Sequence, residues 1–193
     1  MRRSSSLLVI AFLVLCLSPA HAAKESFPAS VVAIVDVQRI LQESLAARSV
    51  QSQIEKHRSK FQAQISKEEA ELREAEQKLT ELRKTEQTDA YAQAEQKLRG
   101  RFLFVERHVQ ARRKALDQAF TDAMDTVRAA LIDVVKKSSK ERGVTLVIVK
   151  QQVIWHDQVI DLTDVVLKRI NQRIPEILIK ISEDGKNISS SEK

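Results

Sequence analysis

The chain has 193 residues, of which 30% are charged, and its formal net charge is +6. It contains three glycines, three prolines and one cysteine, whereas glycine and proline normally make up about 7% and 5% of a globular chain. So few turn residues argue against a catalytic α/β domain, and a single cysteine excludes a disulfide scaffold or a cysteine-ligated metal site. The small positive charge does not by itself indicate a nucleic-acid-binding surface.

The first 22 residues have the features of a secretory signal peptide. Two arginines precede an apolar run of 11 residues at positions 7–17, and small residues occupy Ala20 and Ala22 before the expected cleavage point. We expect cleavage after Ala22, export to the periplasm, the loss of Cys16 with the signal, and a linker at residues 23–30. A membrane anchor is the alternative interpretation, but a spanning helix needs roughly 17–25 apolar residues.

Residues 43–142 contain no proline and one glycine, and apolar residues recur in them at steps of three and four. This spacing predicts two coiled-coil helices, because positions three and four apart share one helix face. In the second helix the expected seam runs through Phe102, Arg112 and Phe120. Phe104 cannot share that seam with Phe102, since positions two apart lie on different faces, so Phe104 is expected to be exposed or packed between subunits.

The two helical segments are expected to form an antiparallel hairpin rather than one rod. Aliphatic runs at 31–35 and 144–149 flank them, and folding the helices back at residues 85–91 brings these two runs together. The same arrangement places acidic residues of the first helix opposite basic residues of the second, with Glu68 facing Arg112. A single rod gives no reason for this charge matching, although chance could produce it.

The residues on either side of the hairpin, 31–42 and 143–174, predict a small β-rich body. Residues 153–160 indicate a strand or hairpin that returns to the sheet, because aliphatic residues flank a polar pair there. A final helix is expected at 165–174, with Thr163 as its cap.

About three short strands per chain are too few to close a barrel, and open strand edges promote aggregation. We therefore expect the body to associate with other copies of itself. The residues expected at this interface are Val32, Ile34, Leu146, Ile148, Ile154 and Trp155. An ordinary core within one chain is the alternative interpretation of these residues.

The two ends of this predicted fold resemble a known family. The sequences VAIVDVQRILQES at residues 32–44, LVIV at 146–149, VIW at 153–155 and DLTDVVL at 161–167 are similar to the ends of the periplasmic chaperone family called Skp, or OmpH-like. The resemblance covers residues 31–174.

The chain departs from this family in three places, one of which is Trp155, where Tyr is common. Many members have Pro and Gly after the Glu–Ser pair, where this chain has Leu45 and Ala46, so a break between the first strand and the first long helix is expected to be lost. The tail at residues 175–193 is longer than usual and is expected to be polar and disordered.

The resemblance implies a mainly α fold with a small β body. Three subunits would complete a β-barrel from their short strands, and three long antiparallel coiled-coil hairpins would project from it around a cavity. In this family the cavity holds unfolded outer-membrane proteins and prevents their aggregation without ATP. The resemblance therefore implies a homotrimeric chaperone that is not an enzyme and needs no cofactor.

The surface expected to hold such clients combines apolar side chains of the arms with positive charge near the tip. Its residues are Lys78, Arg83, Lys84, Lys97, Arg99, Arg101 and Phe104. Cations in this position could attract acidic unfolded chains or an anionic lipid or lipopolysaccharide surface. A solvated helix face is the alternative.

Other chemistries receive less support from the residues. The basic run at 107–114 could bind nucleic acid, but the facing acidic run neutralises it, so no nucleic-acid partner is expected. No catalytic residue or metal ligand is expected, because His57 and His108 lie on different arms and no phosphate loop or nucleophile motif occurs.

Three functions are therefore candidates for this protein. The first is an ATP-independent periplasmic holdase for unfolded outer-membrane proteins, and the second is a structural coiled-coil protein of the cell envelope that binds no client. The third, a basic nucleic-acid-binding protein, conflicts with the expected export.

Overall fold

A computed structural model of the protein describes residues 29–84 and 88–181. The expected signal peptide and most of the linker therefore lie outside the described residues. From Val31 onward the chain forms one unit. Its elements are β1 (Val32–Val35), α1 (Val37–Glu43), α2 (Leu45–Lys84), α3 (Thr88–Lys140), β2 (Leu146–Val149), two short 3-10 helices (Lys150–Gln152 and Gln158–Ile160) and α4 (Thr163–Arg173).

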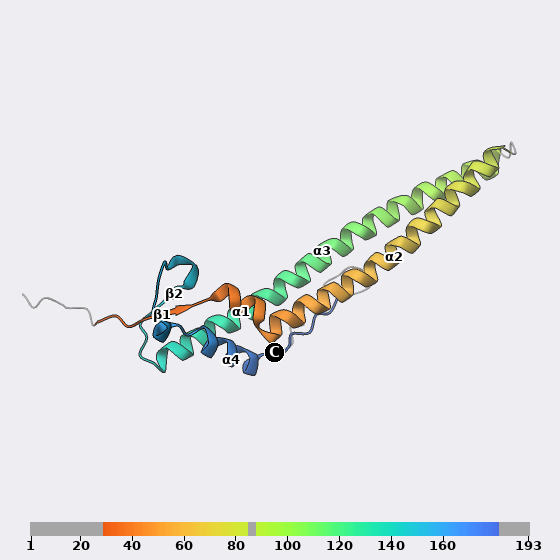
Figure 1. The fold of residues 1–193 in the computed structure, drawn as a ribbon. Helices are drawn as coiled ribbons and strands as arrows, with labels where there is room; N and C mark the ends of the chain where they lie inside the picture. The colour runs from red at the N-terminus through yellow and green to blue at the C-terminus, as the bar shows by residue number, and fades with distance from the viewer. Residues whose placement is uncertain (1–28, 85–87, 182–193) are drawn as a thin grey trace, which may run out of the picture. The chain divides into compact units, whose positions relative to one another are not determined.

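The two long helices α2 and α3 run antiparallel and side by side, as Figure 1 shows. The mainly helical architecture with long helices and a small sheet agrees with the expected fold class. The 40 residues of α2 correspond to a length of about 60 Å. The expected tip at residues 85–91 includes positions 85–87, which lie outside the described residues, and α3 begins at Thr88.

The seam between the two helices differs from the prediction at two aromatic positions. Phe102 and Phe120 are exposed, while Val105 and Ala119 are buried. Arg101 forms an ion pair with Glu71 of α2, so Arg101 rather than Phe102 faces the partner helix. The prediction was wrong here because a charged residue takes a seam position that the apolar spacing assigned to its neighbour.

The pairing of Glu68 with Arg112 was also wrong. Glu68 lies next to His108, and the guanidinium of Arg112 lies over the ring of Phe61, 5.8 Å from its centroid. The two helices are thus displaced by about one turn from the predicted pairing. Charge matching is spread over several turns, and it therefore could not discriminate between registers one turn apart.

A break between α1 and α2 is present, contrary to the expectation from the missing Pro and Gly. Ser44 has extended backbone angles, with ψ of 144°, and its N–H still donates to the carbonyl of Ile40 at 2.9 Å. The N–H of Leu45 donates to Oδ1 of Asn171 at 2.8 Å. Since Ser44 is fully buried and α4 supplies the acceptor for Leu45, the break is held by tertiary contacts and does not need a helix-breaking residue.

The strands β1 and β2 pair in parallel, with Val32 beside Leu146 and Val35 beside Val149. Parallel strands need a long crossover connection, and α1 together with the α2–α3 hairpin provides it. The expected third strand at residues 153–160 was wrong, because this segment contains no strand and ends in a 3-10 helix.

Asp161 explains why the segment before it folds back. Its carboxylate accepts a hydrogen bond from the N–H of Thr163 at 2.9 Å and lies 3.2 Å from Nζ of Lys150. Among the described residues, the strand pairing of Asp161 is limited to an isolated bridge with Ile34 of β1. Lys150 and Asp161 thereby hold together the two ends of a loop, so the residues between them do not extend along the sheet.

The final helix α4 packs its apolar face on the core, and Val166 and Ile170 are fully buried as the spacing predicted. The expected capping role of Thr163 was wrong. Thr163 is the first residue of α4, and its hydroxyl accepts a hydrogen bond from the N–H of Asp36 at 2.9 Å. This bond joins the start of α4 to the start of α1.

The chain continues beyond α4 as an ordered segment. Residues 175–181, expected to belong to a disordered tail, run in an extended conformation beside α2 (Figure 1). Ile177, Ile179 and Ile181 pack against the hydrophobic core. The rest of the expected tail, residues 182–193, lies outside the described residues.

Candidate functional site

The body presents apolar side chains to solvent. Trp155 is 80% exposed, and Ile154 is fully exposed. Val31, Leu146 and Val159 are also exposed. A single large exposed side chain is ordinary, but several in one small body are characteristic of a surface that another chain covers.

A cavity of about 620 Å³ lies beside β2 and is lined by all four residues of that strand, by Leu131, Ile132 and Val135 of α3, and by Val35, Val37 and Leu41. Within residues 29–84 and 88–181, β2 pairs with β1 on one side and with no strand on the other. β2 is therefore an open edge strand, and an apolar cavity lies against it and the end of β1.

The structure places the predicted body residues in four different environments. Leu146 and Ile148 line the cavity, and Ile154 and Trp155 project from the loop before α4. Val32 is half-buried in β1. Ile34 is only 2% exposed, which agrees with the alternative interpretation of an ordinary core for this one residue.

The arm carries a second apolar surface, on α3. Phe102, Leu103 and Phe104 are 57%, 52% and 61% exposed. The exposure of Phe104 agrees with the prediction that it lies outside the seam. Leu103 was not among the predicted binding residues, although three consecutive apolar residues on one helix cannot all face a single partner. We call these three residues the arm patch.

The predicted cations near the tip are mostly engaged in ion pairs. Lys78, Lys84 and Arg99 pair with acidic residues one turn earlier in their own helices, at 3.2, 2.8 and 2.7 Å. Arg101 crosses the seam to Glu71. Arg83 and Lys97 are exposed and form no ion pair with another described residue. A ligand can bind these two cations without first breaking an ion pair of the described residues, although the exposed pairs of the other cations are also weak.

Between the arm patch and the body, a polar cluster interrupts the seam between α2 and α3. Nδ1 of His108 lies 3.3 Å from Oε1 of Glu68, and Nε of Arg112 donates to Nε2 of His108 at 3.4 Å. The rings of Phe61 and Phe104 lie 6.3 and 5.8 Å from the ring of His108. The imidazole therefore connects the seam to the exposed face that carries Phe104.

His57 lies on α2 one turn before Phe61, and its environment disfavours a positive charge. Burial lowers the pKa of His57 below its ordinary value of 6.5, and the nearby charges of Lys60, Arg112 and Lys56 lower it further. Burial and the neighbouring cations therefore favour the neutral form of His57.

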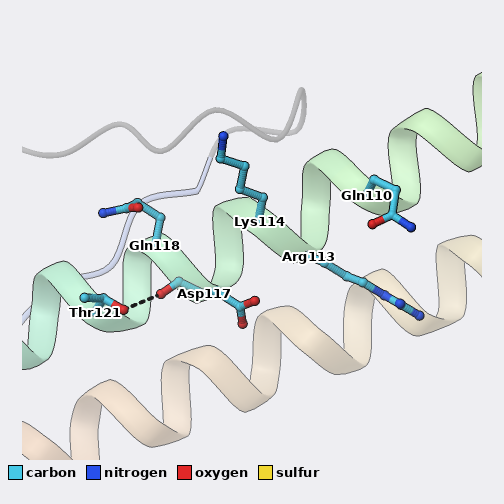
Figure 2. Close-up of a pocket in the computed structure, with 6 residues that line it drawn as sticks. All are labelled: Gln110, Arg113, Lys114, Asp117, Gln118 and Thr121. Carbon is cyan, nitrogen blue, oxygen red and sulfur yellow. Dashed lines mark hydrogen bonds between the residues drawn. The ribbon is translucent and has the colours of Figure 1, made fainter.

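A shallow polar depression on α3 is shown in Figure 2 and is lined by Gln110, Arg113, Lys114, Asp117, Gln118 and Thr121. All six residues come from one helix, and the hydroxyl of Thr121 donates to the carbonyl of Asp117 at 2.9 Å. An active site needs groups that converge from several elements, and this depression offers none.

Two kinds of feature are absent from the described part of the chain. No group of three or more His, Cys, Asp or Glu side chains there could hold a metal ion. No helix within the same residues is long and apolar enough to cross a membrane.

Comparisons with known proteins agree with this geometry. One solved structure with a similar fold is that of an OmpH-like protein from Caulobacter crescentus CB15 assigned as an outer membrane chaperone, with a TM-score of 0.73, 19% identity, and coverage of 80% of this chain and 92% of that chain. None of the curated proteins matches the sequence significantly. The model of the family described as outer membrane protein (OmpH-like) matches residues 31–170, which is well over half of the chain. The protein therefore belongs to the OmpH-like family.

Proposed function

We propose that this protein is an ATP-independent holdase of the periplasm, which binds unfolded outer-membrane proteins and prevents their aggregation before membrane insertion. The observation that carries the proposal is the arm patch, where Phe102, Leu103 and Phe104 stand exposed on a long helix. The family, and the fold shared with a protein assigned as an outer membrane chaperone, support the same conclusion.

The arm patch suits a client that has not folded. An unfolded chain exposes apolar side chains, and burial of apolar surface contributes roughly 25 cal/mol per Å² without requiring a particular sequence. The free cations Arg83 and Lys97 lie nearer the tip, where they would attract acidic segments over a distance. Such a surface holds clients reversibly and needs no nucleotide.

We further propose that three copies assemble through the body. A two-stranded sheet is marginal by itself, and the open side of β2 together with Ile154 and Trp155 supplies apolar surface that a second copy would cover. Closure of the strands into a barrel would remove their open edges. The three arms would then surround a cavity in which the arm patches act together.

A holdase of the periplasm must be exported, so the proposal includes export. The expected signal peptide, cleaved after Ala22, would deliver the mature chain to the periplasm, where unfolded outer-membrane proteins pass. The amino-terminal sequence of the secreted protein tests this point directly. A mature protein that begins at residue 23 supports it, and a retained leader contradicts it.

The holdase activity is tested by diluting a urea-unfolded β-barrel membrane protein into buffer that contains the mature protein. We expect stoichiometric amounts to keep the client soluble, as measured by sedimentation and light scattering. The combined variant Phe102→Ser, Leu103→Ser, Phe104→Ser should lose most of this protection while keeping its helix content. For a matched pair, Phe104→Ser is compared with Phe120→Ser, which changes an exposed phenylalanine of α3 outside the arm patch.

A structural coiled-coil protein without clients is the other function to be separated. Such a protein would assemble but leave the unfolded barrel to aggregate. Assembly without protection would therefore overturn the holdase proposal and favour the structural one.

A further inference from the structure

The segment after α4 has the pattern of an amphipathic strand although it joins no sheet of the described structure. We call residues 175–181, with the sequence PEILIKI, the strap. Its alternate residues Ile177, Ile179 and Ile181 are partly buried against the core, while Leu178 is 67% exposed. Alternation with period two is the signature of an extended segment that presents one face to a partner.

Gln53 of α2 holds the main chain of the strap. Its side-chain amide donates to the carbonyl of Ile177 at 2.7 Å and accepts from the N–H of Ile179 at 2.9 Å. This is the pair of bonds that a neighbouring β-strand would make. The amide is held in place by a hydrogen bond to Oγ of Ser49 at 2.9 Å.

These contacts recognise conformation and pattern rather than a particular sequence. The bonds from Gln53 address main-chain atoms that every non-proline residue has, and the core contacts require only an apolar side chain at alternate positions. Recognition of an extended peptide in protein complexes combines the same two elements. We call the surface around Gln53, with the core beneath Ile177 and Ile179, the strap site.

We propose that the strap site is a binding site for extended client segments with apolar residues at alternate positions, and that the strap occupies it as a tethered competitor. This inference rests on the proposed function. Strands of β-barrel membrane proteins have this alternation, with every second residue facing lipid. An unfolded client therefore carries many segments that match the strap in pattern.

The tether makes the strap an effective competitor. A segment joined to α4 by a short connection meets its site at an effective concentration in the millimolar range. A single client segment at lower concentration displaces it only to a small extent, whereas a client that is already held by the arms presents its segments at comparable local concentration. The strap would thus release the site only to clients already captured.

The experiment uses the full mature chain and a labelled synthetic peptide with the strap sequence, and binding is measured by fluorescence anisotropy. The variant Ile179→Asp disfavours docking of the tethered strap. We expect this variant to bind the peptide at least about tenfold more tightly than the wild-type protein, because the competitor is removed. Leu178→Asp introduces the same charge on the outward face and should leave the affinity at the wild-type level.

Two further measurements test how the strap site recognises the peptide. Adding Gln53→Ala to Ile179→Asp should abolish the gain, and a peptide of the same composition with its three isoleucines adjacent should bind much more weakly. Equal affinity of the wild-type and Ile179→Asp proteins, or equal binding of both peptides, would overturn the proposal. Circular dichroism of each variant verifies that the fold is retained.

The outcome is separable from that of the holdase proposal. If the wild-type protein keeps the unfolded barrel soluble but the peptide pattern is absent, the strap site is refuted and the holdase activity stands. If the peptide pattern is present but the barrel aggregates, the peptide-binding site stands and the holdase function fails.

Discussion

Oε1 of Glu68 lies 3.3 Å from Nδ1 of His108 across the seam of the hairpin. This contact joins α2 to α3 in the middle of the arm, and both side chains are mostly shielded from solvent. Its location fixes which turn of α3 faces which turn of α2. The contact therefore specifies the register of the arm.

We expect the two residues to be energetically coupled. His108→Ala leaves a shielded carboxylate without its partner and should lower the free energy of unfolding by about 1–3 kcal/mol. The double variant Glu68→Leu, His108→Leu should recover most of this loss, since replacing both partners of a shielded polar contact by apolar groups is often nearly neutral in stability. Urea unfolding of the wild type, both single leucine variants and the double variant measures the coupling. Additivity within about 0.5 kcal/mol would show that the pair is not coupled.

The bond between Thr163 and Asp36 predicts a graded effect at the start of α4. Thr163→Val keeps the shape but leaves the N–H of Asp36 without its acceptor in a part-buried position, so it should cost about 1–3 kcal/mol. Thr163→Ser retains the hydroxyl and should lose much less. Thermal unfolding of both variants decides between a hydrogen-bonding and a purely steric role, and equal losses would indicate the latter.

His57 predicts a pH dependence of stability. Because burial and neighbouring cations lower its pKa in the folded state below 6.5, the unfolded chain binds a proton first as the pH falls. The free energy of unfolding should therefore decrease as the pH falls from about 6.5 to the folded-state pKa, and level off below it. In His57→Gln this part of the decrease should be absent. Urea unfolding of both proteins at pH 7.5 and 5.5 measures the free energy of unfolding. If both proteins lose the same amount between these pH values, His57 is not the source of the decrease.

The exposed body residues predict the assembly state. Trp155→Ser should shift the protein to a lower mass in sedimentation velocity, because this side chain is 80% exposed in the single chain and would be covered in a trimer. Its helix content should remain, since few contacts within the chain are lost. Leu178→Ser, which removes an exposed apolar side chain of the strap, serves as the control. A mass unaffected by Trp155→Ser would place the interface elsewhere.

The cations of the arm predict a salt-dependent capture of clients. Arg83→Glu with Lys97→Glu should slow client binding at low ionic strength and have little effect at 1 M salt, where screening shortens electrostatic range to about 3 Å. Stopped-flow fluorescence of a labelled client measures the rate. Arg101→Glu is a poor substitute, because it would also set two carboxylates against each other at Glu71. Equal rates for wild type and the double variant at low salt would exclude these cations.

The general plan of the fold could be predicted because it depends on composition and spacing. The absence of proline from 43–142 and the aliphatic runs on either side favoured a hairpin that returns to a small sheet. The residues that face the partner helix could not be predicted at every position. Arg101 and Phe102, like Ala119 and Phe120, are neighbours, and either member of each pair fits the three- and four-residue spacing of the seam. The exposure of Phe102 and the contact of Arg101 with Glu71 show in the structure that Phe102 is displaced from the seam.

Two other features required knowledge of tertiary contacts. The run at 153–155 has strand-forming residues, but the contacts of Asp161 close the segment into a loop. The alternation of Ile177, Ile179 and Ile181 was visible in the sequence, but the polar residues that follow suggested disorder. The position of this segment beside α2 depends on Gln53, which is distant in the sequence and belongs to no recognisable motif.

The parallel pairing of β1 with β2 also determines the order in which the chain can fold. Val31 and Thr145, which are hydrogen-bonded at the base, are 114 residues apart, and contacts between such distant residues form slowly when they must be found by diffusion of an open chain. A hairpin that closes from its tip avoids this search, because each new contact closes only a short additional loop. We therefore expect the arm to form the folding nucleus and the sheet to form last. Substitutions in the arm seam should chiefly slow refolding, whereas substitutions in the sheet should chiefly accelerate unfolding.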